Sequence, residues 1–408
     1  MSIRAQLMLA PVMVLTTVLI AQAAADPPYK VVCYFESWAV YRPGLGSHDV
    51  EDIDFDLCTH HIYTFAGLNT NHKIHSLDPY HDLYNNYGEG AYLRFTGMKE
   101  THPQIKTMIS IGGWNEGSKK YSQMASSAEY RATFVQSVVD FLAKYKFDGL
   151  DLDWEYPTLR GGAPEDKENF VLLLKDLSEA LRPRGLLLSA ALSPGRQNIE
   201  PAYDLDEMVK YLDFMNVMNY DYHGDWDPFI GHNAPMFLTQ KDVEHGEPFQ
   251  WFSLNYTMNY YLGRGVPGSQ LMMGFPLYGR GFKLQDPSKH APYDPSNGPM
   301  DGCPYSEEPG FCGYNELCER IFSQSGWTDV HDGDMQAIYS YKGSNWIGWD
   351  DLNIVKLKLD YLKSIGVGGA MLWSIDTDDF RGLCGPKYAI ANLIWSELNG
   401  AADSEGRE

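Results

Sequence analysis

The sequence predicts an α/β fold, a (β/α)8 TIM barrel with a small α+β domain inserted between its seventh and eighth strands. Short β-rich runs alternate with segments whose apolar residues recur three and four positions apart, as in residues 130–144, 167–181 and 354–364. Strands that alternate with helices pair in parallel, and eight such units indicate a barrel. A doubly wound sheet is the alternative. The eight runs are residues 30–35, 60–65, 105–111, 149–154, 186–192, 214–219, 271–277 and 369–373.

The insertion is predicted from the spacing between the seventh and eighth runs. About 70 residues, 279–349, lie where a connecting loop usually has two to six. This segment contains glycine, proline, aromatic residues and three of the six cysteines, so it is too long and too aromatic for a plain loop. We therefore expect residues 279–349 to form the inserted domain, and residues 26–278 together with 350–398 to form the barrel.

The two ends of the chain predict secretion. Residues 1–25 have the pattern of a signal peptide, with Arg4 at a positive start, an apolar run over 7–20 and three alanines at 23–25. The run is short for a membrane span of about 20 residues, although an uncleaved anchor is the alternative. No later stretch is long and apolar enough to cross a bilayer, so an extracellular protein is expected. Residues 399–408 are expected to be a disordered tail.

The charge balance limits the partners. Of the 408 residues, 54 are acidic and 32 are Lys or Arg, which gives a formal net charge of −22. Such an excess of acid argues against nucleic acid and against anionic membrane surfaces, because both require basic residues. A neutral ligand fits better, and 27 Tyr and 10 Trp residues can supply flat apolar faces for it. A monomer is expected.

The six cysteines indicate disulfides, because a secreted chain is exposed to an oxidising environment. Six cysteines allow 15 pairings. Cys33 and Cys58 could bridge neighbouring strands, and Cys303 and Cys312 could close a short loop, which would leave Cys318 to reach Cys384. No Cys-x-x-Cys motif occurs, so neither zinc nor another structural metal is expected.

The chain contains one N-glycosylation sequon, at Asn255, and one decoy. The sequon fits a secreted surface without proving that it is used. Residues 263–268 match the glycine spacing of a dinucleotide-binding loop, but they precede a strand and include Pro267, so no nucleotide cofactor is expected.

An acidic strand is the most informative segment. Residues 147–157 read Phe-Asp-Gly-Leu-Asp-Leu-Asp-Trp-Glu-Tyr-Pro, and alternation places Asp151, Asp153 and Glu155 on one face of the strand. In a barrel this face points inward and leads to the C-terminal mouth, where the active sites of barrel enzymes lie. Three inward carboxylates are costly to ionise together, so they must share protons, bind a cation or serve catalysis.

Two chemistries fit this strand. The carboxylates could hold Mg²⁺ or Ca²⁺ for hydrolysis of a phosphate ester, or a protonated Glu155 could act as general acid in glycoside hydrolysis. The other strand ends favour the second, because they carry many aromatic residues and few basic ones. Together these residues predict a groove on which sugar rings stack. The aromatic residues are Tyr34, Trp38, Phe65, Trp114, Tyr156, Tyr220, Tyr278 and Trp373.

Four motifs carry a resemblance to a known family. Asp148-Gly-x-Asp151-x-Asp153-x-Glu155 resembles the signature of glycoside hydrolase family 18, the chitinases. The segments 110–114, 218–221 and 371–373 resemble the motifs of that family on its third, sixth and eighth strands, and the match covers residues 29–398. The segments 33–38 and 220–224 look most like those of animal chitinases, of an arthropod kind. The family also pairs cysteines at positions that match Cys33–Cys58 and Cys318–Cys384.

The resemblance implies a substrate-assisted mechanism that retains the anomeric configuration and passes through an oxazolinium ion. Glu155 would protonate the glycosidic oxygen, Asp153 would orient the acetamido group, and Asp151 would share a proton with Asp153. Tyr220 would donate to the acetamido oxygen, and Asp221 would support the same sugar. Further substrate contacts are expected from Trp373 below this sugar and from Trp38, Trp114, Trp226, Tyr34, Phe65, Tyr156, Met218, Tyr278 and Arg280.

The expected substrate is therefore chitin or a chito-oligosaccharide. Two readings with the same fold stay open, which are a non-catalytic chitinase-like lectin and an endo-β-N-acetylglucosaminidase that acts on N-linked glycans. Retention of Glu155, Asp153, Asp151 and Tyr220 favours an active enzyme over the lectin. A metal-dependent hydrolase is the third alternative, and chelator-insensitive activity would exclude it.

Overall fold

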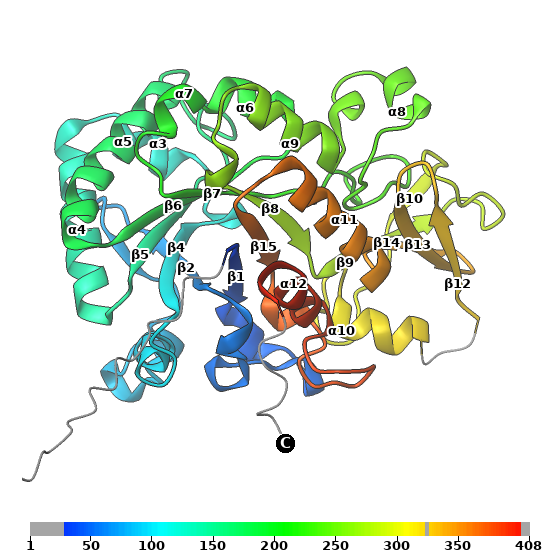
Figure 1. Ribbon diagram of the computed structural model, residues 1–408, viewed down its shortest axis with the longest axis horizontal. Helices are drawn as coiled ribbons and strands as arrows, with labels where there is room; N and C mark the ends of the chain where they lie inside the picture. Colours follow the sequence, from blue (N-terminus) through cyan, green and yellow to red (C-terminus); the bar gives the residue numbers. More distant parts are fainter. Residues whose placement is uncertain (1–27, 323–325, 401–408) are drawn as a thin grey trace, which may run out of the picture.

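A closed barrel of eight parallel strands forms the body of the molecule, and it confirms the predicted fold class (Figure 1). The computed structural model describes residues 28–322 and 326–400, so the predicted signal peptide and residues 401–408 of the predicted tail lie outside the described residues. Pairing of β1 with both β2 and β15 closes the ring. The barrel strands are β1 (Lys30–Glu36), β2 (His60–Leu68), β4 (Lys106–Gly112), β5 (Gly149–Asp153), β6 (Leu187–Leu192), β7 (Phe214–Val217), β8 (Leu271–Pro276) and β15 (Gly369–Trp373).

Helices surround this ring and lie close to the predicted segments. The runs predicted at 130–144, 167–181 and 354–364 are helices α4, α5 and α11. None of the helices in the described part of the chain has the length and apolarity needed to cross a membrane. The helices are α1 (Pro79–Asp82), α2 (Ala91–Gly97), α3 (Lys119–Ala125), α4 (Ala128–Tyr145), α5 (Asp166–Leu181), α6 (Arg196–Ala202), α7 (Leu205–Met208), α8 (Gln240–His245), α9 (Leu254–Gly263), α10 (Tyr314–Leu317), α11 (Leu352–Ile365) and α12 (Ala389–Asn399).

A second sheet follows β8 and confirms the insertion between the seventh and eighth barrel strands. It stands to one side of the barrel (Figure 1), and its strands are antiparallel. It begins at Tyr278 and ends at Trp349, while the limits of the insertion as a separate domain stay a prediction. Its strands are β9 (Tyr278–Leu284), β10 (Ser296–Pro299), β11 (Phe311–Gly313), β12 (Thr328–Asp332), β13 (Ala337–Lys342) and β14 (Asn345–Trp349), and the short β3 (Ile74–Ser76) extends the first sheet beside β2.

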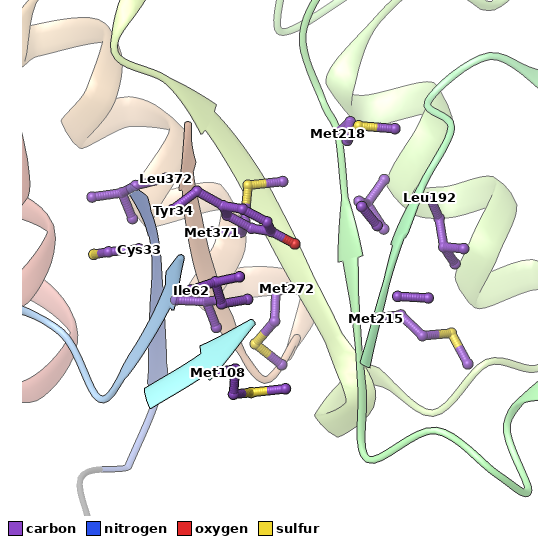
Figure 2. Packing of buried hydrophobic residues seen from close by; sticks show 14 of the residues in the cluster. Cys33, Tyr34, Ile62, Met108, Leu192, Met215, Met218, Met272, Met371 and Leu372 are labelled. Carbon is purple, nitrogen blue, oxygen red and sulfur yellow. The ribbon is translucent and has the colours of Figure 1, made fainter. Parts of the chain in front are cut away.

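Side chains alternate between the inside and the outside of the barrel. Tyr34 on β1 and Met371 on β15 point into the ring of strands, whereas their neighbours Cys33 and Leu372 point away from it (Figure 2). All four are buried, because helices cover the outside and side chains fill the inside. Polar groups on the inner face must therefore find partners within the barrel.

The six cysteines form three disulfides. They are Cys33–Cys58, Cys303–Cys312 and Cys318–Cys384, the three expected pairs. The third links the insertion to the segment that follows β15.

A buried ion pair fixes the return from the insertion to the barrel. The ammonium group of Lys358 on α11 contacts the carboxylate of Asp350, just after β14, and donates to the carbonyl of Ala234 at 2.7 Å. Burial lowers the pKa of Lys358 and raises that of Asp350, and the charge of the partner opposes each shift. Each group therefore depends on the other to remain charged. Replacing one partner leaves the other charge buried without compensation.

We expect Lys358→Met to lower the free energy of unfolding by about 3–5 kcal/mol, measured by urea denaturation, because Asp350 loses its counter-ion. Lys356→Met, two residues away, is the matched control: Lys356 pairs with Glu397 at the surface, where such pairs contribute up to about 1 kcal/mol. Equal effects of the two substitutions would contradict this account.

Candidate active site

The three predicted carboxylates lie along β5 and just beyond its end, in order from the barrel centre toward the mouth. Asp151 and Asp153 are on β5, and Glu155 follows two residues after its end. Trp154, which alternates with them, packs on the helix side against Phe170 of α5, with ring centroids 5.6 Å apart. The carboxylates therefore share the inner face, as the alternation predicts.

Asp151 is fully buried and is surrounded by hydrogen-bond donors from four other strands. Its Oδ2 accepts from Tyr34 at 2.9 Å and from Ser110 at 2.8 Å, and its Oδ1 accepts from Ser189 at 2.6 Å and from Asn216 at 3.2 Å. Burial raises the pKa of Asp151, while these donors lower it. Such donors stabilise a carboxylate where water is absent.

Asp153 lies one step closer to the mouth and is less well satisfied. It is buried, and its Oδ1 accepts no hydrogen bond from the described residues. Burial, then the charge of Glu155 and then that of Asp151 raise its pKa well above the usual range. No hydrogen bond links Asp151 to Asp153 among the described contacts, so the expected sharing of a proton between them stays a prediction.

Glu155 is the half-buried carboxylate nearest to the mouth. Burial raises its pKa to about 7, and the nearby charge of Asp221 acts in the same direction, whereas a hydrogen bond with Tyr156 and the charge of Arg160 oppose the increase. A carboxyl group with this pKa retains a proton near neutral pH, as a general acid requires.

The approach of β4 to β5 requires glycine at position 112. Gly112 pairs with Asp153 and has a φ of +124°, and a Cβ there would lie 2.0 Å from the Asp153 carbonyl oxygen. Any side chain would therefore displace the backbone that carries Asp153. This gives a structural reason for the glycine in the predicted third-strand motif.

A second polar group forms where the β7 segment meets the insertion. The carboxylate of Asp221 receives two hydrogen bonds from Arg280, at 2.8 and 2.7 Å, and one from the Tyr278 hydroxyl at 2.6 Å. These three charge-assisted hydrogen bonds fix the position of the Asp221 carboxylate. Tyr220, the preceding residue, is buried, and its hydroxyl contacts the Met371 sulfur at 3.6 Å.

Four predicted aromatic residues form a continuous row. Trp38 stacks on Phe65 with centroids 5.9 Å apart, Phe65 stacks on Trp373 at 5.8 Å, and Trp373 contacts Tyr34 at 5.4 Å. Trp38 is exposed, Phe65 and Trp373 are half-buried, and Tyr34 is buried. The row therefore runs from the protein surface to the donor group around Asp151.

The remaining predicted binding residues fall into two classes. Trp114 and Trp226 are exposed, and each has an arginine beside its ring. Tyr156, Met218 and Tyr278 are buried, so their rings or thioether offer little open surface. We assign these three, together with Tyr34, to support of the site rather than to stacking against a ligand.

Several residues of the site were not predicted. Ser110, Ser189 and Asn216 occupy inward positions of otherwise apolar strands, and that pattern could have identified them as partners of the acidic strand. Arg42 gave no such signal. It bonds to Asp376 at 2.6 Å and contacts Glu36, and so links the segment that carries Trp38 to the one that follows Trp373.

The three carboxylates differ in their surroundings and do not resemble a metal site. Among the described residues, the groups of three possible ligands that converge within 4.8 Å lie elsewhere, and two of them contain disulfide-bonded cysteines. The structure therefore favours acid catalysis over the cation-binding alternative.

The sequon lies on α9 and is partly covered. Asn255 is half-buried and donates to the Tyr361 hydroxyl at 3.0 Å, while the Thr257 hydroxyl is buried and donates to the Pro194 carbonyl. A glycan on Asn255 would have to displace the contact with Tyr361, so its use as a glycosylation site stays a prediction.

Together the barrel, the inward carboxylates and the aromatic row define a glycoside hydrolase. The model of the glycosyl hydrolases family 18 matches residues 30–378, so the chain belongs to that family. The chain is 43% identical over 363 residues to a Drosophila melanogaster protein described as probable chitinase 2, and the match covers 87% of this chain and 73% of that protein. The expected resemblance to arthropod chitinases is confirmed.

Solved structures extend this comparison. The group IV chitinase of Ostrinia furnacalis superposes with a TM-score of 0.87 at 42% identity, over 91% of this chain and 99% of that one, and a second structure of it contains allosamidin. Human YKL-39, described as a pseudo-chitinase that retains chitooligosaccharide binding, superposes with a TM-score of 0.83 at 34% identity, over 91% of this chain and 99% of that one.

We expect Gly112→Ala to lower the free energy of unfolding by at least about 2 kcal/mol and hydrolytic activity by about 100-fold, because the new Cβ displaces the Asp153 backbone. Urea denaturation and initial rates measure the two effects. Gly97→Ala is the control, since this helical glycine has open space around it and should gain up to about 1 kcal/mol. Wild-type behaviour of Gly112→Ala would contradict the geometry.

Proposed function

We propose that this chain is a secreted chitinase that hydrolyses β-1,4-linked N-acetylglucosamine by substrate-assisted catalysis with retention of configuration. The observation that carries the proposal is the change in surroundings from one carboxylate to the next along β5. Asp151 has hydrogen-bond donors at both oxygens, Asp153 is buried with one oxygen that lacks a described partner, and the pKa of Glu155 is raised to about 7. Each of the three has the properties that its proposed role requires.

Glu155 supplies the proton. It lies nearest to the mouth and is protonated near neutral pH, so it can transfer its proton to the glycosidic oxygen as the bond to C1 breaks. No enzyme carboxylate attacks C1. The acetamido carbonyl oxygen of the same sugar closes on C1 and forms an oxazolinium ion. Water then attacks C1 from the side that the leaving group has left and gives its proton to the Glu155 carboxylate, which restores the acid.

Asp153 orients the acetamido group. Its unpartnered Oδ1 can accept the acetamido N–H, and its negative charge then stabilises the positive charge that develops on the oxazolinium ring. Asp151 lies deeper in the barrel on the same strand, β5, and its charge raises the pKa of Asp153. Burial favours the neutral form of Asp153 before the substrate binds, and in the proposed mechanism this proton passes to Asp151 as the acetamido N–H takes its place.

Tyr220 and Asp221 hold the sugar. A thioether is a weak acceptor, so the Tyr220 hydroxyl near the Met371 sulfur retains the capacity to donate a strong hydrogen bond to the acetamido oxygen. Asp221 is fixed by Arg280 and Tyr278 and accepts from a sugar hydroxyl. Trp373, in the row with Phe65 and Trp38, supports the apolar face of the ring.

Secretion is supported by the pattern of residues 1–25 and by three disulfides, which persist in oxidising compartments. The alternative is a binding protein like YKL-39. The raised pKa of Glu155 and the open Asp153 oxygen favour an active enzyme, because binding alone requires neither.

We expect Glu155→Gln to lower the hydrolysis of a fluorogenic chito-oligosaccharide by at least about 1,000-fold, because a side-chain amide is not acidic enough to protonate the glycosidic oxygen. Asp153→Asn should lose about 100-fold or more in kcat while chitohexaose still binds, since the aromatic row is unchanged. Calorimetry measures the binding. Near wild-type turnover in Glu155→Gln would refute the assignment, and an inactive wild type that binds chitohexaose would favour the binding protein.

The pH dependence follows from the same group. Since Glu155 must be protonated, kcat/KM should fall as the pH rises through about 7, and this apparent pKa belongs to Glu155 and Asp153 as an interacting pair. Asp221→Asn removes a negative charge that raises the pKa of Glu155, so the basic limb of the profile should move to lower pH. A basic limb that does not move, or moves upward, would contradict the assigned electrostatics.

A further inference from the structure

Arg160 lies at the junction of the general acid and an exposed tryptophan. It belongs to the loop between Glu155 and α5, and its guanidinium carbon is 3.4 Å from the centre of the Trp114 ring. One of its terminal nitrogens donates to the Glu155 carbonyl and the other to the Trp114 carbonyl, both at 2.9 Å. This one side chain therefore contacts two segments, which follow β4 and β5.

The geometry restricts the indole of Trp114. A guanidinium that stacks on the ring while its in-plane N–H groups bind two carbonyls has little freedom to move, so the ring beneath it is also held. Trp114 is 58% exposed although one of its faces is covered. The opposite face is consequently the open one, and the arginine that covers the first face also binds the Glu155 carbonyl.

The arrangement around Trp226, another exposed tryptophan, is different. The guanidinium of Arg280 is 5.2 Å from the ring of Trp226, and its nitrogens bind the carboxylate of Asp221. In the described structure, the guanidinium of Arg280 thus forms an ion pair. Among the described residues, Arg160 forms hydrogen bonds to two backbone carbonyls and a stacking contact, and none to a carboxylate.

We infer that Arg160 is a positioning residue that presents Trp114 as a fixed platform for an N-acetylglucosamine unit next to the scissile bond, and that it holds the Glu155 backbone in register with that platform. This inference rests on the proposed function, and it adds a residue that neither touches the reacting atoms nor belongs to the acidic strand. The sugar contacts Trp114 through its C–H face, and Arg160 acts through the tryptophan.

A second consequence follows from the charge of Arg160, which lowers the pKa of Glu155. Loss of this charge should therefore move the basic limb of the pH profile to higher pH. The other groups that face Glu155 are unchanged by such a substitution, so they do not contribute to the shift. They are the carboxylates of Asp153 and Asp221 and the phenols of Tyr156, Tyr203 and Tyr220.

The test uses Arg160→Met, which removes the charge and both hydrogen bonds, and Arg160→Lys, which keeps the charge without the planar stack. Kinetics on chitohexaose across pH and thermal unfolding are measured for both. Arg160→Met should raise KM about five-fold and move the basic limb upward, while Arg160→Lys should restore the basic limb and leave KM raised. Arg184→Gln, an exposed arginine whose guanidinium donates to the Ala180 carbonyl, is the control and should change neither value.

A double-mutant cycle with Trp114→Ala isolates the contact. If Arg160 acts through the tryptophan, Arg160→Met should have almost no further effect on KM once the indole is absent. Full additivity would overturn the inference, as would unchanged KM and pH profile in Arg160→Met, or a fall in melting temperature with unchanged KM. Wild-type protein that neither hydrolyses nor binds chitohexaose would instead refute the proposed function, and the inference with it.

Discussion

The burial of a carboxylate at the centre of a closed barrel is the constraint on which the rest of the site depends. Asp151 has no access to water, and an unpaired charge there would cost several kcal/mol. Donors from β1, β4, β6 and β7 converge on its two oxygens. Because every donor comes from a different strand, the group links five of the eight barrel strands, β5 included, and fixes the ionisation of one residue.

This constraint sets the properties of the two carboxylates above it. Asp151 takes up the inward donors at its level, so Asp153 has an oxygen without a described partner, in a field that favours its neutral form. Glu155, nearer to the mouth, experiences that field together with Arg160 and solvent, and its pKa is raised only to about 7. Three carboxylates at a two-residue spacing thus acquire three different environments from their depth and from the neighbours at each level.

The sequence was sufficient for the barrel, the insertion and the acidic strand, because alternation and spacing directly encode which face of a strand a residue occupies. It did not reveal partners that depend on three-dimensional neighbours. Ser110 and Ser189 stand out as inward polar residues of apolar strands, but their common partner, Asp151, is known only from the pairing of β4 and β6 with β5. Burial was equally hidden: Tyr34 and Tyr278 read as members of an aromatic rim, but their hydroxyls are bound to Asp151 and Asp221.

The insertion completes the site rather than merely standing beside it. Its first strand, β9, provides both Tyr278 and Arg280, and these bind Asp221, which belongs to the segment after β7. Gly279, between them, pairs with Cys312 of the Cys303–Cys312 disulfide, so the same short strand is held by a covalent loop. A barrel without this strand would leave Asp221 without the donors that orient it. The position of the insertion after β8 therefore has a chemical reason, since it brings a cation to Asp221 without placing positive charge beside Asp151.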